Sequence, residues 1–149
     1  MDHIETAVGE TGYVISTDPA RVDLDVVAGY LGGESYWAKG RPAGVVESSI
    51  EHSTPFGAYA ADGHQAGFAR LVSDRSTFGW VCDVFVLDEH RGHGLGKALI
   101  DAVTAFADGL GIGLLTLATD DAHGLYRRFD FAESSDPQKW MYRRHPDRV

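Results

Sequence analysis

The chain has 149 residues, a formal net charge of −9, and 44% hydrophobic and 23% charged residues. At roughly 100–200 residues per domain, this predicts one globular domain over residues 1–149. The acidic balance argues against a nucleic-acid-binding protein, which carries clustered Lys and Arg. No run approaches the roughly 18 apolar residues of a membrane span, and the one cysteine, Cys82, excludes an internal disulfide framework. The N-terminus has neither a basic start nor an apolar stretch, so we expect a cytoplasmic protein.

The charge is unevenly distributed along the chain. Residues 1–89 contain 14 acidic and 5 basic side chains, whereas residues 90–149 contain 8 of each. An anionic ligand would therefore bind more easily to the second part, provided that this part contains an anion-binding element.

The first half of the chain predicts strands, two helices and then a hairpin. Residues 13–17 form a short β-prone run, and Asp18-Pro19 is a helix-start signal for a helix that ends at Gly32-Gly33. A second, weaker helix is expected over residues 42–51. Residues 56–60 and 65–72, separated by Asp62-Gly63, predict two strands joined by a tight turn.

The second half contains the most regular helix pattern. A strand is expected over residues 78–87, and a helix over residues 94–108 with Gly109 as its end. A buried strand at 114–118, a short helix at 121–128 and last strands at Phe131 and at 140–143 complete the pattern. This order predicts an α/β fold of the mixed type, with a mostly antiparallel sheet of about six to seven strands and helices on both faces.

The most informative segment lies between the strand at 78–87 and the strong helix. It reads Arg91-Gly92-His93-Gly94-Leu95-Gly96-Lys97, with three glycines at alternate positions. Glycine permits positive φ and removes side chains, so several backbone N–H groups can converge at the helix N-terminus. Such an element binds phosphate, although a well-capped glycine-rich turn would give the same spacing. It is not a Walker A loop, because no Ser or Thr follows Lys97, and Gly-x-Gly-x-Gly is not the dinucleotide-binding fingerprint.

The segment resembles the acyl-CoA-binding motif of the GNAT superfamily of N-acetyltransferases, Arg/Gln-x-x-Gly-x-Gly/Ala. The match begins at Arg91, and residues 125–131 resemble the family's Tyr-x-x-x-Gly-Phe signature, with Asp130 in place of the glycine. Asp is among the few residues that tolerate a left-handed turn, so the same backbone is still possible. The resemblance covers residues 78–143 well and the earlier residues only in element order.

The resemblance implies a splay between two central strands and acetyl-CoA as co-substrate, with no metal. The pyrophosphate would lie on the amides of the glycine-rich segment. The pantetheine arm would pair with the preceding strand, where a backbone N–H would polarise the acetyl carbonyl. The cofactor-binding residues expected from it are Phe85, Val86, Leu87, Arg91, Gly92, His93, Gly94, Leu95, Gly96 and Lys97.

The resemblance also implies catalytic roles. Tyr126 holds the position of the general acid that protonates the departing thiolate, although it could instead be a core tyrosine. Asp83 is a candidate general base; its alternative is a salt bridge to Arg70 or Arg75. His123 is the competing base, because an unperturbed imidazole has a pKa near 6.5, but it could equally be an ordinary surface residue.

The acceptor is the least defined part of this interpretation. Tyr36, Trp37 and Trp80 are candidates for an acceptor pocket, although core packing would explain each of them. The acidic first part favours a cationic amine, and we expect a small-molecule primary amine attacked directly in a ternary complex. The alternatives are an acetyltransferase acting on protein N-termini or lysines, and a non-catalytic CoA-binding sensor module. Dimers are common in the family, so a homodimer is possible.

Overall fold

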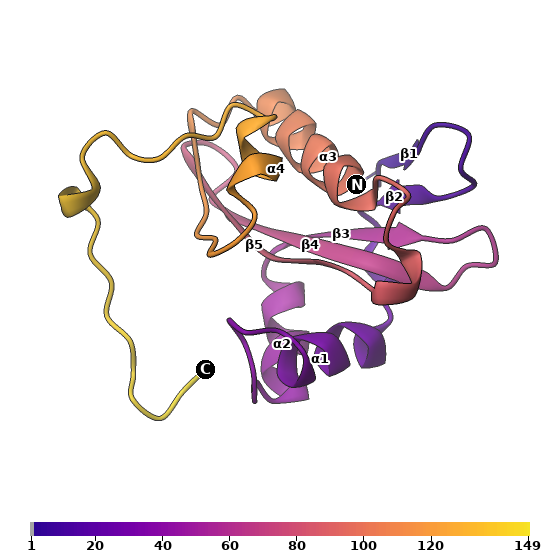
Figure 1. The fold of residues 1–149 in the computed structure, drawn as a ribbon, viewed down its shortest axis with the longest axis horizontal. Helices are drawn as coiled ribbons and strands as arrows, with labels where there is room; N and C mark the ends of the chain where they lie inside the picture. Colours follow the sequence, from indigo (N-terminus) through magenta and orange to yellow (C-terminus); the bar gives the residue numbers. More distant parts are fainter. Residues whose placement is uncertain (1) are drawn as a thin grey trace.

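The computed structural model describes residues 2–149 and contains one six-stranded sheet in the order β1-β2-β3-β4-β5-β6 (Figure 1). All neighbouring strands are antiparallel except β5 and β6, which are parallel. The strands are β1 (Glu5–Ala7), β2 (Val14–Ser16), β3 (Thr54–Tyr59), β4 (Gln65–Ser73), β5 (Phe78–Val86) and β6 (Leu114–Thr116). The predicted mixed, mostly antiparallel sheet is therefore confirmed.

Helices cover both faces of this sheet. On one face lie α1 (Leu24–Gly33) and α2 (Ala43–Glu51), and on the other lie α3 (Leu95–Leu110) and α4 (His123–Arg127) (Figure 1). Two separate apolar cores result. One packs Leu31 and Val46 against Phe68 and Phe85 of the sheet. The other packs the buried face of α3, which includes Leu99, against the opposite side.

Several predicted boundaries shift for local reasons. Asp18 caps only a 3-10 turn, Pro19–Arg21, and α1 begins afterwards because Asp23 accepts a hydrogen bond from the N–H of Val26 at 3.2 Å. Helix α3 passes the predicted end at Gly109 and stops at Gly111, whose φ of +74° is typical of a helix C-terminus. Strand β1 was not predicted, because its side chains are all exposed and carry no apolar alternation.

The prediction of last strands at Phe131 and at residues 140–143 is wrong. After α4 the chain forms only a 3-10 turn, Pro137–Lys139, and swings away from the sheet (Figure 1). Trp140, Met141 and Tyr142 are exposed, and residues 140–143 donate no ladder hydrogen bonds. β-propensity alone does not form a strand where no neighbouring strand edge pairs with it.

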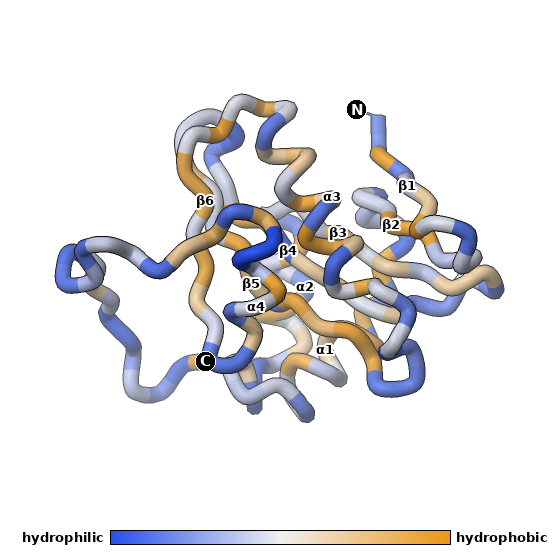
Figure 2. The backbone as a smooth tube through the Cα atoms, turned by 45° about the horizontal axis from the view of Figure 1, so that its top comes forward, coloured by the Kyte–Doolittle hydropathy of each residue, from blue (hydrophilic) through white to orange (hydrophobic). Residues whose placement is uncertain are grey.

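Hydropathy follows this architecture. Apolar residues concentrate along β6 and the end of β5, and hydrophilic residues along the outer loops (Figure 2). The buried residues of α3 pack against the sheet. No helix in residues 2–149 is both long and apolar enough to cross a membrane.

Candidate active site

The two central strands separate partway along their length. Strands β5 and β6 pair only from Phe78 with Leu114 to Trp80 with Thr116. Beyond Trp80, the rest of β5 has β4 on one side and no strand on the other. The predicted splay therefore leaves one edge of β5 open just before the glycine-rich segment.

Only part of the predicted strand contact is available at this open edge. The N–H of Leu87 donates to the carbonyl of Ala66 at 2.9 Å, so it points toward the β4 side. Backbone groups alternate in direction along a strand, and Val86 therefore faces the open side. Its carbonyl accepts a hydrogen bond from Nε of Arg91 at 3.3 Å, which agrees with that direction. Of Phe85, Val86 and Leu87, Val86 alone presents its backbone to the splay.

The glycine-rich segment presents a row of free amides. Gly92 and Gly94 have φ values of +87° and +76°, conformations that favour glycine. Within the described part of the chain, the N–H groups from Gly92 to Lys97 donate to no backbone or side-chain acceptor. A Cβ at Gly96 would make only an ordinary van der Waals contact with Leu125, at 3.9 Å, so packing against α4 does not require glycine there. The segment thus forms an anion-binding concavity at the start of a sixteen-residue helix.

Side chains around this segment hold it in place. The Oη of Tyr13 lies 2.8 Å from Nδ1 of His90, and the Tyr13 ring is 5.3 Å from that of His93. Arg91 pairs with Asp88 at 3.0 Å on the surface. Tyr13 was not predicted as a site residue, because it is 77 residues from His90 along the chain and only the fold brings the two together.

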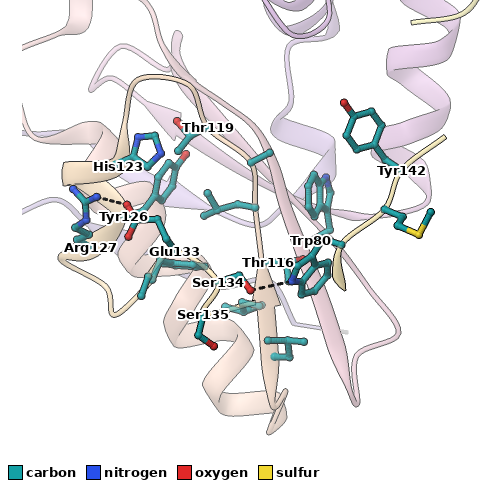
Figure 3. Close-up of a pocket in the computed structure, with 18 residues that line it drawn as sticks. Trp80, Thr116, Thr119, His123, Tyr126, Arg127, Glu133, Ser134, Ser135 and Tyr142 are labelled. Atoms are coloured by element: carbon teal, nitrogen blue, oxygen red, sulfur yellow. Dashed lines mark hydrogen bonds and ion pairs between the residues drawn. The ribbon is translucent and has the colours of Figure 1, made fainter. Parts of the chain in front are cut away.

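Tyr126 lies where two cavities meet. It is 8% exposed, it comes from α4, and its ring packs edge-on against Phe131 at 5.9 Å. Figure 3 shows Tyr126 beside His123 and Arg127, opposite Trp80. Burial, with smaller contributions from nearby Tyr36 and Asp121, raises the pKa of Tyr126 to about 12. The phenol is therefore protonated at neutral pH and available as a proton donor.

The first cavity, about 690 Å³, lies between β6 and the C-terminal segment. His123 and Trp80 line it together with Tyr126 and apolar residues of β6 (Figure 3). The second cavity, about 570 Å³, contains all three predicted acceptor-site aromatics, Tyr36, Trp37 and Trp80. Asp83 lines only the second cavity and His123 only the first, so the two candidate bases are separated.

Asp83 forms the centre of a buried charge cluster. Its carboxylate accepts hydrogen bonds from Nε1 of Trp37 at 3.0 Å, from Nη1 of Arg41 at 3.2 Å, and from Nε of Arg70 at 2.9 Å. The side chain of Asp83 is 2% exposed. The salt bridge to Arg70 that sequence analysis raised as an alternative is present, whereas Arg75 lies over the ring of Phe106 instead. Arg41 was missed, because nothing in the sequence pairs a loop residue with β5.

A bulge in β5 explains how two adjacent residues reach one cavity. The β4–β5 register shifts between Phe68 and Arg70, and Asp83 has a φ of +54°. Cys82 and Asp83 consequently both line the second cavity, although neighbours in a regular strand point to opposite faces. Burial raises the pKa of the Cys82 thiol to about 12, so it is no thiolate nucleophile at neutral pH.

Asp130 adopts a left-handed backbone conformation, as expected for a residue at the place of the signature glycine. Its φ is +67°, in the left-handed region, so Asp replaces glycine with the backbone retained. In residues 2–149, no cluster of three or more His, Cys, Asp or Glu is arranged to hold a metal ion.

Comparison with known proteins agrees with this geometry. Residues 9–131 match the Acetyltransferase (GNAT) family. A candidate GNAT-family acetyltransferase from Xanthomonas campestris is 45% identical, with a TM-score of 0.85 over 90% of this chain and 94% of that one. A candidate acetyltransferase from Gibberella zeae is 28% identical over 79% of this chain and 82% of its own length. A GNAT-family protein from Streptococcus pneumoniae, 22% identical over 92% of this chain and 99% of that one, shares the fold with a TM-score of 0.66. The free amides at the start of α3, the splayed strands and the family match together show that the chain belongs to the GNAT family of acetyltransferases.

Proposed function

We propose that the protein transfers an acetyl group from acetyl-CoA to a primary amine of a small molecule, by direct attack in a ternary complex. The observation that carries this proposal is the row of unpaired amides from Gly92 to Lys97 beside the open edge of β5. This arrangement fits a ligand that combines a pyrophosphate with an extended arm carrying amide groups.

The glycine-rich segment would hold the pyrophosphate. Its N–H groups have no acceptor among the described residues, two of its glycines have positive φ, and the N-terminal end of α3 adds favourable potential for an anion. A Cβ at Gly92 or Gly94 would meet no atom within 4 Å, so the space beyond the backbone is open for a ligand. Acetyl-CoA supplies the acetyl group as a thioester.

Val86 is the residue of β5 that would pair with the pantetheine arm. Its N–H and C=O face the open edge, and a backbone N–H on this edge can polarise a carbonyl as an oxyanion-type donor. Phe85 instead serves the fold, because its ring stacks on Tyr30 at a centroid distance of 4.1 Å.

Tyr126 would act as the general acid toward the departing thiolate. Its raised pKa keeps the proton on the phenol until an alkanethiolate of high basicity develops beside it. For the general base we favour His123 over Asp83, because Asp83 is already engaged by three donor side chains. The ring of His123 is exposed, forms no hydrogen bond to another described residue and lines the first cavity, which meets the second cavity at Tyr126. The attacking amine of an acceptor in the second cavity would therefore lie at this junction, beside Tyr126.

The size of the acceptor cavity favours a small molecule over a protein. A cavity of about 570 Å³, lined by side chains of several elements, accommodates a compact ligand. A protein acetyltransferase and a non-catalytic CoA sensor stay as alternatives, and the sensor would bind CoA without releasing thiol in the presence of amines.

Calorimetric titration with acetyl-CoA, desulfo-CoA and ATP tests the proposal. We expect micromolar binding of the first two ligands and none of ATP, followed by amine-dependent thiol release in a screen of primary amines. Absence of acetyl-CoA binding at millimolar concentration would refute the assignment of the glycine-rich segment. Binding without thiol release for any amine or peptide would support the sensor.

A further inference from the structure

The second cavity contains an uneven set of buried charges. Arg41 and Arg70 place two guanidinium groups on the single carboxylate of Asp83, and their side chains are only 16% and 12% exposed. This cluster therefore carries a net charge of +1, and in residues 2–149 neither arginine forms an ion pair with any carboxylate other than Asp83. Removing charge from water is costly, so a sheltered excess cation favours an anionic ligand.

The free donors belong to Arg41. Arg70 uses Nε and Nη2 on Asp83 and directs Nη1 toward Oγ of Ser53 at 3.5 Å. Arg41 uses only Nη1, which lies 3.2 Å from each oxygen of Asp83. Its Nε and Nη2 donate to no group in residues 2–149, and these two nitrogens form the edge that binds a carboxylate with two parallel hydrogen bonds.

Acidic groups line the same cavity next to the proposed general acid. Asp120 and Asp121 come from the segment between β6 and α4, and both are exposed. The N–H of Asp120 donates to Oη of Tyr36 at 3.1 Å, which fixes this segment over the cavity, and Asp121 lies close enough to Tyr126 to affect its titration. The cavity thus has a net positive charge at the Asp83 cluster, which comes from its two arginines, and negative charge near Tyr126, which comes from Asp120 and Asp121. Arg144 of the C-terminal segment adds a further cation to the lining.

We propose that the acceptor is an amino carboxylate, a small molecule that carries a free amine and a carboxylate. The carboxylate would bind the free edge of Arg41, and the amine, which arrives as an ammonium ion, would lie toward Asp120 and Asp121. This inference deepens the proposed function and rests on it. It also refines the expectation of a purely cationic amine, which followed from the net charge of residues 1–89 rather than from the charges that line the cavity.

Matched pairs of acceptors test the proposal on the full chain. Thiol release from acetyl-CoA is measured with L-histidine against histamine, L-tryptophan against tryptamine, and L-lysine against cadaverine, and with aminoethyl phosphate as a phosphate-bearing amine. We expect kcat/KM to be at least about tenfold higher for a carboxylate-bearing member, as one charge-assisted hydrogen-bond pair provides. Equal values within every pair, no turnover of any member, or preference for the phosphate would overturn the proposal.

Variants of Arg41 separate recognition from folding. Arg41→Gln should reduce the ratio of kcat/KM between carboxylate and decarboxylated acceptors by about tenfold to a hundredfold, and Arg41→Lys should reduce it less. Arg21→Gln removes a surface arginine outside the cavity and should leave the ratio unchanged. An unchanged ratio in Arg41→Gln would contradict the proposal. The affinity for acetyl-CoA, measured separately by calorimetry, distinguishes this failure from a failure of the proposed function.

Discussion

The buried Asp83 cluster allows a stability prediction with a definite order of effects. The substitution Asp83→Asn removes the negative charge but keeps the size of the side chain and its tolerance of positive φ. It leaves Arg41 and Arg70 facing each other's charge without a carboxylate between them. We therefore expect it to destabilise the fold more than loss of either arginine.

The magnitude follows from burial. Breaking a buried ion pair by removing one partner costs about 3–5 kcal/mol, because the remaining charge is uncompensated. Both guanidinium groups retain a little exposure, at 16% and 12%, so we expect the lower end, about 3 kcal/mol. For a domain of this size that shift lowers Tm by about 6–12 °C. Arg41→Gln should cost about 1 kcal/mol, because Asp83 keeps Arg70 and Trp37 as donors.

A surface pair provides the matched control. Glu5 accepts from Nη1 of Arg21 at 2.8 Å, with side-chain exposures of 60% and 32%. Glu5→Gln is also an acid-to-amide change in an ion pair with arginine, and it should cost about 0.2–1 kcal/mol. Urea unfolding followed by far-UV circular dichroism gives the free energy of unfolding for each variant, provided that the slope is unchanged. Asp83→Asn within 1 kcal/mol of Glu5→Gln would refute the reasoning and would mean that water reaches both guanidinium groups.

Four further predictions test other parts of the site. Tyr126→Phe should lower kcat by about 10²–10⁴-fold, the usual contribution of a general acid, with acetyl-CoA affinity nearly unchanged; an equal loss of affinity would mean a packing role. Gly94→Val should abolish acetyl-CoA binding while the circular dichroism spectrum is retained. Valine disfavours the φ of +76° at this position, and its side chain would fill the open space next to the backbone. An unchanged affinity for acetyl-CoA would show that the glycine-rich segment does not bind the cofactor. Burial raises the pKa values of Tyr59, Cys82 and Tyr126 to about 12 from 10.0, 9.0 and 10.0, so the folded state binds more protons above about pH 9, and urea midpoints should fall as pH rises from 9 to 12. Urea midpoints that do not change between pH 9 and 12 would contradict the burial of these three side chains. Light scattering should detect a homodimer, because exposed apolar residues lie near the unpaired edge of β6, and Met141→Asp should weaken it; a monomer at all concentrations would contradict this.

The sequence predicts those elements whose signals are local. The hairpin around Gly63, with its φ of +90°, and helix α3 follow from turn chemistry and from apolar periodicity within a few residues. The strands expected at Phe131 and at 140–143 fail because a strand needs a partner edge, which residue preference does not specify. Strand β1 was missed for the opposite reason: its pairing with β2 is present without any burial pattern.

The candidate site divides in the same way. The glycine-rich segment and Tyr126 are recognisable because the motif residues are adjacent along the chain. Arg41 is not, because it is 42 residues from Asp83 and comes from a loop after α1. The alternation rule also predicts that Cys82 and Asp83 face opposite sides, and the bulge overrides it.

The bulge connects the two halves of the site. In a regular β5 the side chains of Asp83 and Cys82 would point to opposite faces of the sheet. The Asp83 carboxylate would then not lie on the side of the sheet where it meets both arginines. The extra residue in β5 instead places Asp83 at φ +54°, a conformation that costs free energy for a residue other than glycine. Three donor side chains on the carboxylate offset that cost. Past the same bulge Val86 turns its backbone to the open edge, so one irregularity orients both the charge at the proposed acceptor cavity and the strand edge that we propose for acetyl-CoA. Replacing the Asp83 cluster should therefore alter acceptor selection and stability together, whereas changes at Gly94 should alter cofactor binding alone.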